Sequence, residues 1–400
     1  MDDYNYRFSS KYNYCNYNHK IIQKERKAHE LKKEDIYYTV NVQYFRPYRM
    51  YFLIIPKEYL NNIDSLRKNK KDIFAKGKIL TFTYYRKFRR PFKFDAVIDS
   101  QEKDPYKKGI VYVNLVPIKK RYRYKFAREL IGVFEVKERN GDLTYDRMKN
   151  ALVEFEEGKV CSKNIEHYII GVDNIRTKNM NEIFNYNRFF PTNIRDYYTL
   201  TQNQIYKINK IFDKEMTTIS IYSENNKKLI CLIIYAIYQM RNFIDDKILI
   251  CSSSNTSADD IALELLNFKH FIKQLNILRI YAKNQEIIKR NQALDDISYH
   301  KLKIREENRR NNFGGRNLLI EKNDIIISAC VNSYCDEIIN YEFPFVIIVD
   351  ADNSNENENL IPLTLKSKHV ILISYDWNQS DQYNLYQRMK YIYPQNHIDL

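Results

Sequence analysis

The chain has 400 residues, of which 44% are apolar and 29% charged, and its formal net charge is +15 at pH 7. This length and apolar content exclude a disordered tail and allow two or three domains with cores of their own. The positive charge favours an anionic partner, with nucleic acid as the first candidate. No apolar run reaches the roughly 18–20 residues that span a bilayer, and the N-terminus has no signal-peptide pattern, so we expect a cytoplasmic protein without a membrane partner.

The spacing of the cysteines argues against zinc and against disulfides. No C-x-x-C pair occurs, and scattered cysteines in a cytosolic protein are mostly buried and reduced. We therefore expect no metal ion and no disulfide at the six cysteines, which are Cys15, Cys161, Cys231, Cys251, Cys330 and Cys335.

The first third of the chain predicts a basic helix followed by short strands. Residues 1–18 are rich in Tyr and Asn and are expected to fray, whereas the basic stretch His19–Lys33 has the pattern of a solvated helix. Five β-type segments broken by turns then indicate a small barrel. They are Tyr37–Gln43, Tyr51–Ile55, Ile79–Tyr85, Phe94–Ile98 and Gly109–Leu115.

Two stretches beside these segments, Tyr84–Phe94 and Lys119–Phe126, interleave aromatic residues with Lys and Arg. Such cations grip phosphates, and the rings between them stack on bases. The alternative is an exposed basic hairpin without a ligand. The predicted RNA-contact residues are Tyr84, Tyr85, Arg86, Lys87, Arg89, Arg90, Lys119, Lys120, Arg121 and Arg123.

The second half of the chain has the strand–helix alternation of an α/β domain. Leu143–Glu157 carries a helical apolar stripe, and from Leu200 strands and helices alternate, which is typical of a parallel sheet covered by helices. A polar helical excursion interrupts this pattern at Gln285–Arg310. Strands are expected at Thr217–Tyr222, Lys247–Cys251, Leu275–Ile280, Asp324–Cys330, Val346–Val349 and His369–Ile373, and helices at Gln202–Phe212, Leu229–Met240 and Ile261–Phe268.

The last two of these strands are each followed by a carboxylate, Asp350 and Asp376. A carboxylate just past a buried strand is how nucleotide-hydrolysing domains hold magnesium. The alternative is an ordinary strand end, in which Asp350 caps the following turn. A polar, Asn-rich loop and then an apolar turn at Leu360–Leu365 are expected after the first strand.

In order along the chain, five blocks resemble the up-frameshift RNA helicases of nonsense-mediated mRNA decay, which belong to helicase superfamily one. Tyr145–Leu152 is similar to the family's stalk helix, and Leu200–Ile208 to its Q motif. The resemblance implies that Gln204 reads the adenine edge and that Ser254 and Asn255 contact RNA phosphates. The other blocks are Ile248–Leu266, Asn323–Val331 and Ser374–Met389.

The departures from this family concern the nucleotide site. The glycine-rich phosphate loop is replaced by Tyr222–Leu229, which contains no glycine, although Lys228 stands at the lysine position and could hold a vestigial nucleotide. Ala351 replaces the glutamate that positions the attacking water. Asp376 and Gln379 are retained from the last motif. We therefore predict that no catalytic set is intact at Lys228, Asp350, Ala351, Asp376 and Gln379.

The resemblance implies a RecA-like parallel sheet with flanking helices, plus a small β-barrel carried on a helical stalk. A second RecA-like domain and a zinc-binding domain are expected to be absent. The implied divisions are a tail and first stalk helix at 1–36, an accessory barrel at 37–142, a second stalk helix at 143–171, and a first RecA-like domain at 172–400 with an insertion at about 284–318.

Three functions are compatible with these features. The first is a non-catalytic module that binds RNA or ribonucleoprotein, with the ribosome or mRNA-decay proteins as protein partners and no cofactor. The second is a divergent ATP-dependent RNA helicase or ATPase, completed by another chain and requiring ATP and magnesium. The third is a structural subunit of a large assembly. Because the phosphate loop and the acidic motif are degraded together, we favour the first and expect no enzymatic activity.

Overall fold

The computed structural model describes most of the chain, which divides into two compact units. One unit contains Met1–Lys24, Leu143–Tyr281 and Asn291–Leu400, and the other contains Glu25–Asp142 and Ala282–Arg290. The described residues are 7–31, 38–45, 50–54, 79–84, 92–103, 111–117, 132–138, 142–158, 160–173, 175, 201–222, 226–241, 247–268, 275–282, 291–309, 318–375 and 384–400.

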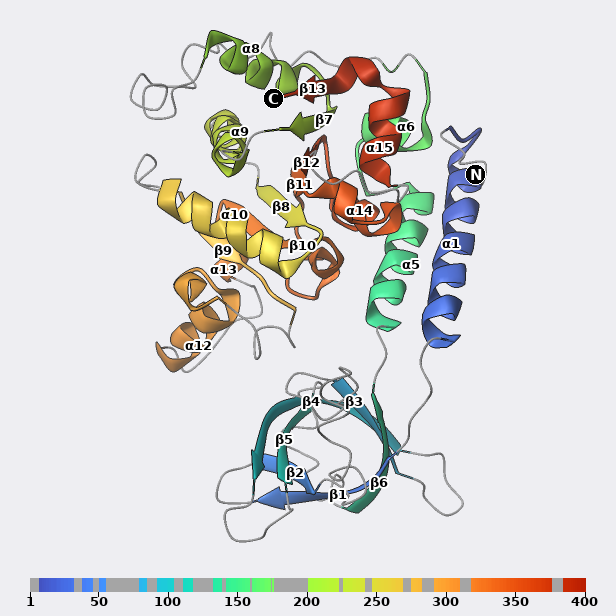
Figure 1. Ribbon diagram of the computed structural model, residues 1–400, viewed down its shortest axis with the longest axis vertical. Helices are drawn as coiled ribbons and strands as arrows, with labels where there is room; N and C mark the ends of the chain where they lie inside the picture. Colours follow the sequence, from blue (N-terminus) through green and yellow to red (C-terminus); the bar gives the residue numbers. More distant parts are fainter. Residues whose placement is uncertain are drawn as a thin grey trace. The chain divides into compact units, whose positions relative to one another are not determined.

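In the second of these units, six antiparallel strands pair in the order β1-β2-β5-β4-β3-β6, and β6 returns to β1, so the ring is closed (Figure 1). Its interior follows the two-residue period of a strand. Val40 and Val42 of β1 are buried, while Thr39 and Asn41 between and beside them are exposed. The strands are β1 (Tyr38–Phe45), β2 (Met50–Ile54), β3 (Ile79–Tyr84), β4 (Phe92–Lys103), β5 (Val111–Pro117) and β6 (Gly132–Glu138).

The sequence predicts five of these strands and misses β6. The strand β4 is also longer than expected, because a register shift between Ile98 and Ser100 lets the pairing with β5 continue past the point where the apolar pattern stops. Such an irregularity hides the second half of a strand from an argument based on strict alternation.

In the other unit, seven strands form an all-parallel sheet in the order β13-β7-β12-β11-β8-β10-β9. Six of them were expected from continuous apolar runs, and β13 was not. This mixed α/β sheet with flanking helices is consistent with the predicted RecA-like fold. The strands are β7 (Met216–Ile221), β8 (Ile248–Ser252), β9 (Ile277–Arg279), β10 (Ile325–Ala329), β11 (Phe345–Val349), β12 (His369–Tyr375) and β13 (His397–Asp399).

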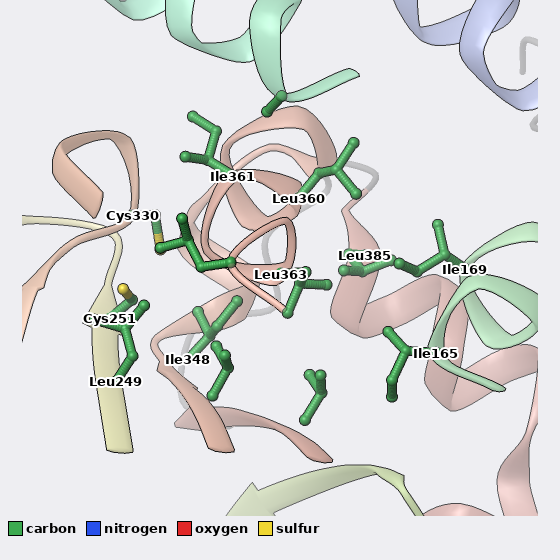
Figure 2. Packing of buried hydrophobic residues seen from close by; sticks show 14 of the residues in the cluster. Ile165, Ile169, Leu249, Cys251, Cys330, Ile348, Leu360, Ile361, Leu363 and Leu385 are labelled. Atoms are coloured by element: carbon green, nitrogen blue, oxygen red, sulfur yellow. The ribbon is translucent and has the colours of Figure 1, made fainter. Parts of the chain in front are cut away.

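Both faces of the sheet are covered, which explains the uninterrupted apolar runs. Along β11, Phe345, Ile347 and Val349 face one core, which also contains apolar residues of three helices between Gln202 and Phe268. Val346 and Ile348 face the opposite core, which contains residues of the first helix of the chain, of two helices between Asp142 and Ile170, and of two helices between Glu356 and Ile392. Figure 2 shows part of this second core.

Most of the described helices overlap expected ones. The described helices are α1 (Lys11–Leu31), α5 (Asp142–Glu157), α6 (Lys163–Ile170), α8 (Gln202–Lys210), α9 (Asn226–Arg241), α10 (Asn255–Phe268), α12 (Tyr299–Arg309), α13 (Leu318–Glu321), α14 (Glu356–Leu363) and α15 (Leu385–Ile392). The helix α8 starts at the predicted Gln202, whereas α9 and α10 start earlier than predicted. Of the predicted polar excursion, the described part contains the short 3₁₀ helix η5 (Gln292–Leu294) and α12.

Two predictions about segments that follow strands are wrong. The helix expected at Ile261–Phe268 begins earlier, because α10 starts at Asn255. The segment after β11 is a helix, α14, rather than a loop and an apolar turn. Asn355 and Glu358 form a capping box there, in which Glu358 N–H donates to Asn355 Oδ1 at 2.9 Å. Asparagine favours turns and helix caps equally, so composition alone does not separate them.

The prediction that residues 1–18 fray is wrong for the described part. The helix α1 begins at Lys11, Tyr14 is fully buried, and the Phe8 N–H donates to Ile170 O at 2.9 Å. A buried ion pair lies beside these rings. The fully buried Arg388 binds Glu356 through two nitrogens, at 3.1 and 2.6 Å.

Candidate functional site

Asp350 lies at the carboxyl end of the central strand β11, where the sequence predicts a magnesium ligand. Its backbone is left-handed, with φ 55°, a conformation that Asp adopts more readily than most residues. The side chain is 8% exposed and accepts a short hydrogen bond from the Ser257 hydroxyl of α10. Its side chain makes no cap hydrogen bond to the following 3₁₀ turn, so the cap expected at an ordinary strand end is not formed.

The backbone after Asp350 is fixed by two asparagines. Asn359 Nδ2 donates to Ala351 O at 2.8 Å, and Asn384 Nδ2 donates to Asp352 O at 3.0 Å. The Ala351 methyl is fully buried, and Asp352 is 4% exposed. The position of the expected glutamate is therefore filled by a packed methyl group, and shifting Asp352 toward a ligand would break these backbone contacts.

Tyr375, at the carboxyl end of β12, lies close to these acids. Burial raises the pKa of its phenol, and the nearby charges of Asp350, Asp260 and Asp352 raise the pKa further. The hydroxyl therefore stays protonated and can donate a hydrogen bond among carboxylates. Within the described residues, no group of three or more His, Cys, Asp or Glu side chains is placed to hold a metal ion.

Gln204, predicted to read adenine, occupies the third position of α8 and forms a capping box with Thr201. Gln204 N–H donates to Thr201 Oγ1 at 3.2 Å, and Thr201 N–H donates to Gln204 Oε1 at 3.0 Å. The same spacing of Thr and Gln that suggests a Q motif is thus sufficient to begin a helix. An adenine edge would compete with Thr201 for the Gln204 carbonyl oxygen.

Ser254 and Asn255, predicted to contact RNA phosphates, stabilise the start of α10. Ser257 N–H donates to the Ser254 hydroxyl at 3.1 Å, which is the geometry of a helix cap. Asn255 accepts a hydrogen bond from a buried arginine, since Arg279 Nη2 donates to Asn255 Oδ1 at 3.1 Å. Both residues lie at the carboxyl end of the sheet, but both have structural roles there.

Arg279 organises this end of the sheet and was not identified from the sequence. It is fully buried, and its Nε donates to Asp259 Oδ1 at 2.8 Å. Its Nη1 donates to Ile280 O at 2.7 Å, and the guanidinium carbon lies 4.0 Å from the centre of the Tyr281 ring. No local pattern singles out an arginine that ends a strand, because its partners come from other elements.

The structure describes only some of the other residues predicted for the nucleotide site. Lys228 is exposed in the first turn of α9, and Leu229, which stands where a magnesium-binding hydroxyl is expected, is buried. Residues 223–225 of the predicted phosphate slot, and both Asp376 and Gln379, lie outside the described residues.

Of the predicted RNA-contact residues in the barrel, Tyr84 is described. It ends β3, is 37% exposed, and has its ring centre 5.5 Å from that of Phe134. The other predicted residues lie outside the described part of the chain: Tyr85, Arg86, Lys87, Arg89, Arg90, Lys119, Lys120, Arg121 and Arg123.

Ser220, His397 and Asp399 have the residue types of a hydrolase triad but not its geometry. His397 Nε2 lies 3.2 Å from Ser220 Oγ and 3.0 Å from Asp399 Oδ1, so both compete for one nitrogen. In a triad the acid binds the other ring nitrogen, which here lies 3.0 Å from Thr218 Oγ1. Ser220 is fully buried and accepts from Lys390 Nζ at 3.0 Å, so the cluster stabilises the β7–β13 pairing.

A hollow of about 460 Å³ lies at the amino ends of β7 and β13, beside the last turn of α8. The sequence analysis did not predict it. The spacing of Tyr206 and Lys210 on one helix face is the only local signal for it. Its polar lining includes Tyr206, Lys210, Asp213, Lys214, Asn396 and His397.

The geometry defines a parallel α/β sheet of the kind found in RecA-like or P-loop domains, with an acidic residue at the carboxyl end of the central strand. No protein-family model and no curated protein matches the chain. The resemblance to up-frameshift helicases therefore stays a prediction from the motifs. None of the helices in the described ranges has the length and apolarity that a bilayer crossing requires.

Proposed function

We propose that this chain is a non-catalytic module that binds RNA or ribonucleoprotein, built on the scaffold of one half of an up-frameshift-like helicase. Binding is assigned to the barrel, and the parallel sheet acts as a scaffold. The ribosome and the proteins of mRNA decay are the protein partners that the resemblance suggests, and the cytoplasm is the expected location.

The strand register of the barrel is the observation that carries the RNA-binding part of this proposal. Tyr84 pairs with Phe92, and Thr83 pairs with Glu135, so the end of β3 and the starts of β4 and β6 share one rim. The pairing of Ala96 with Pro117 adds the end of β5 to the same rim.

The two predicted basic stretches are joined to these strand ends. Residues 85–91 follow β3 and residues 118–131 precede β6; together they contain ten Lys and Arg residues, four in the first and six in the second, and one Glu. Cations in segments joined to one rim favour binding of a phosphate backbone, and the Tyr and Phe residues in the same segments offer rings for stacking.

The non-catalytic part of the proposal is supported by the carboxyl end of the sheet. Hydrolysis needs a carboxylate free to bind magnesium and a second acid to position water. Asp350 is bound to Ser257, and the next residue is the buried Ala351.

Charge reversal in the first basic stretch tests the proposal. The variant changes Arg86, Lys87, Arg89 and Arg90 to Glu. We expect its affinity for a single-stranded RNA to fall about tenfold or more at moderate salt, with a shallower dependence on salt, because fewer counterions are released. Fluorescence anisotropy with labelled RNA at several salt concentrations measures both quantities.

A matched control makes the same change in charge at the opposite rim. The segment between Ile54 and Ile79 is joined to that rim, and its residues Lys68, Lys70, Lys71 and Lys76 are changed to Glu. We expect a smaller loss of affinity. Equal losses of affinity in both variants would show that RNA binding depends on the net charge of the protein and not on the first basic stretch. If the wild-type protein does not bind RNA, the proposal is overturned.

A further inference from the structure

The hollow at the amino ends of β7 and β13 has the size of a small-ligand site. Its volume of about 460 Å³ falls within the usual range of such sites. Its residues Thr217 and His397 lie at the start of their strands, whereas Asp350 follows the end of β11. It is thus separate from the carboxyl edge, where ligands of parallel sheets ordinarily bind.

Tyr206 gives the hollow an aromatic surface. The residue is 59% exposed, although it belongs to a helix whose opposite face buries Ile205 and Ile208. Lys210 Nζ lies 5.5 Å from the ring centre and covers part of it. The remaining exposed ring surface can stack on a planar base, an interaction that alanine substitution typically values at about 1–3 kcal/mol.

Lysines outnumber acidic residues two to one in the lining of the hollow. Lys210 and Asp213 are 3.0 Å apart, and the lysine side chain is 48% exposed. Because exposed ion pairs of this kind contribute little, Lys210 can turn to a phosphate at small cost. Lys214 supplies the second cation of the lining.

His397 adds a polar ring to the lining of the hollow, and this ring is uncharged at neutral pH. Burial lowers the pKa of His397, and the charge of Lys390 lowers it further, against the opposing effect of Asp399. The neutral ring is held by Thr218 and Ser220 of β7. A lining with a neutral histidine, two lysines and an exposed tyrosine suits a ligand that has a planar polar ring and one phosphate.

We propose that this hollow binds one nucleotide of a single-stranded RNA, with the base stacked on Tyr206 and the phosphate held by Lys210 and Lys214. The inference rests on the proposed RNA-binding function and adds a second contact region to it, on the sheet unit. A nucleotide in an RNA strand and a free mononucleotide share this chemistry, so the experiment separates them.

The test measures the binding of a labelled oligouridylate of about 12 nucleotides to the full chain. Tyr206→Ala should weaken binding about fivefold to 100-fold, and Tyr206→Phe, which keeps the ring, should stay close to wild type. Lys210→Gln should reduce the slope of log affinity against log salt by about one, which Tyr206→Ala should not do.

The matched control is Tyr391→Ala, which removes a somewhat more exposed tyrosine that does not line the hollow. Circular dichroism checks that each variant is folded. If wild type binds RNA and Tyr206→Ala binds as well as Tyr391→Ala, the nucleotide site is rejected while the RNA-binding function stands. If wild type binds no RNA, both fail. If uridine monophosphate binds, if its affinity falls in Tyr206→Ala, and if RNA does not bind, the ligand is a free nucleotide and the proposal is overturned.

Discussion

The two ends of the parallel sheet differ in how their polar residues are used. At the carboxyl end, two of the described residues predicted to bind ligands have partners within the protein: Asp350 binds Ser257, and Asn255 binds Arg279. At the amino end, the lining of the hollow keeps Tyr206 largely exposed. A residue in a motif position can therefore serve the fold alone, and a site can form where no motif points.

The difference has a physical basis. The carboxyl ends of the strands lead into helix starts, whose first backbone N–H groups need acceptors. Ser254 provides one such acceptor for α10, and Asn355 provides another for α14. The amino ends of β7 and β13 are entered by short 3₁₀ turns, η4 (Ile211–Asp213) and η8 (Pro394–Asn396), which leave polar side chains around an open space.

The largest expected effect comes from Arg279→Ala at the carboxyl end. Removing the guanidinium would leave the Asp259 carboxylate without its buried partner, and we expect the free energy of unfolding to fall by about 3–5 kcal/mol. The matched variant Arg305→Ala breaks an exposed pair with Asp296 and should cost at most about 1 kcal/mol. Urea unfolding followed by circular dichroism measures both. Similar losses would contradict a structural role for Arg279.

Acidification should lower the free energy of unfolding through His369, the first residue of β12, at the amino end of the sheet. Burial, together with a smaller effect of the Lys368 charge, lowers the pKa of this histidine to about 4. The unfolded chain, with a pKa near 6.5, takes up the proton first. The stabilisation is therefore complete above about pH 6.5 and is lost as the pH falls toward 4, by about 3 kcal/mol at most.

His369→Phe isolates this effect, because phenylalanine keeps the ring that stacks on Phe345 with the ring centres 5.3 Å apart but cannot take up a proton. Urea midpoints of the variant should fall less steeply than those of wild type between neutral pH and about pH 4.5. Parallel curves would show that other groups control the acid sensitivity.

The smallest expected effect is that of ATP with magnesium on the melting temperature, where we expect no shift. A ligand at about 100 times its Kd would stabilise the protein by about 2.7 kcal/mol, which corresponds to several degrees. Differential scanning fluorimetry with ATP, with and without magnesium, detects such a change. A magnesium-dependent shift that disappears in Asp350→Asn would establish an active nucleotide site and favour the ATPase alternative.

The sheet was predictable from the sequence because its central strands are short apolar runs separated by helical patterns, as in Phe345–Val349. The strand β13 was not, since HID has three residues and no such run. Tyr14 was assigned to a frayed segment because Tyr and Asn resemble a tail in composition, although the ring is fully buried.

The site was less predictable than the fold because its interactions are long-range. The sequence identifies Asp350 as a strand-end carboxylate, but its partner Ser257 stands 93 residues away. Arg279 and Asp259 likewise meet only when β9 and α10 pack together. Local spacing describes Gln204 well as a helix cap and also as a Q motif, so only the contacts of its side chain distinguish the two roles.

The Glu356–Arg388 pair has a consequence for how the chain opens. Arg388 lies 5.6 Å from the ring centre of Phe8 and 5.5 Å from that of Tyr14, and its Nη2 also donates to Ile169 O at 2.7 Å. Detaching the first turns of α1 would let water reach a bidentate ion pair that also anchors α14 and α15. Residues near the two termini therefore belong to one cooperative block and open together rather than unravel separately.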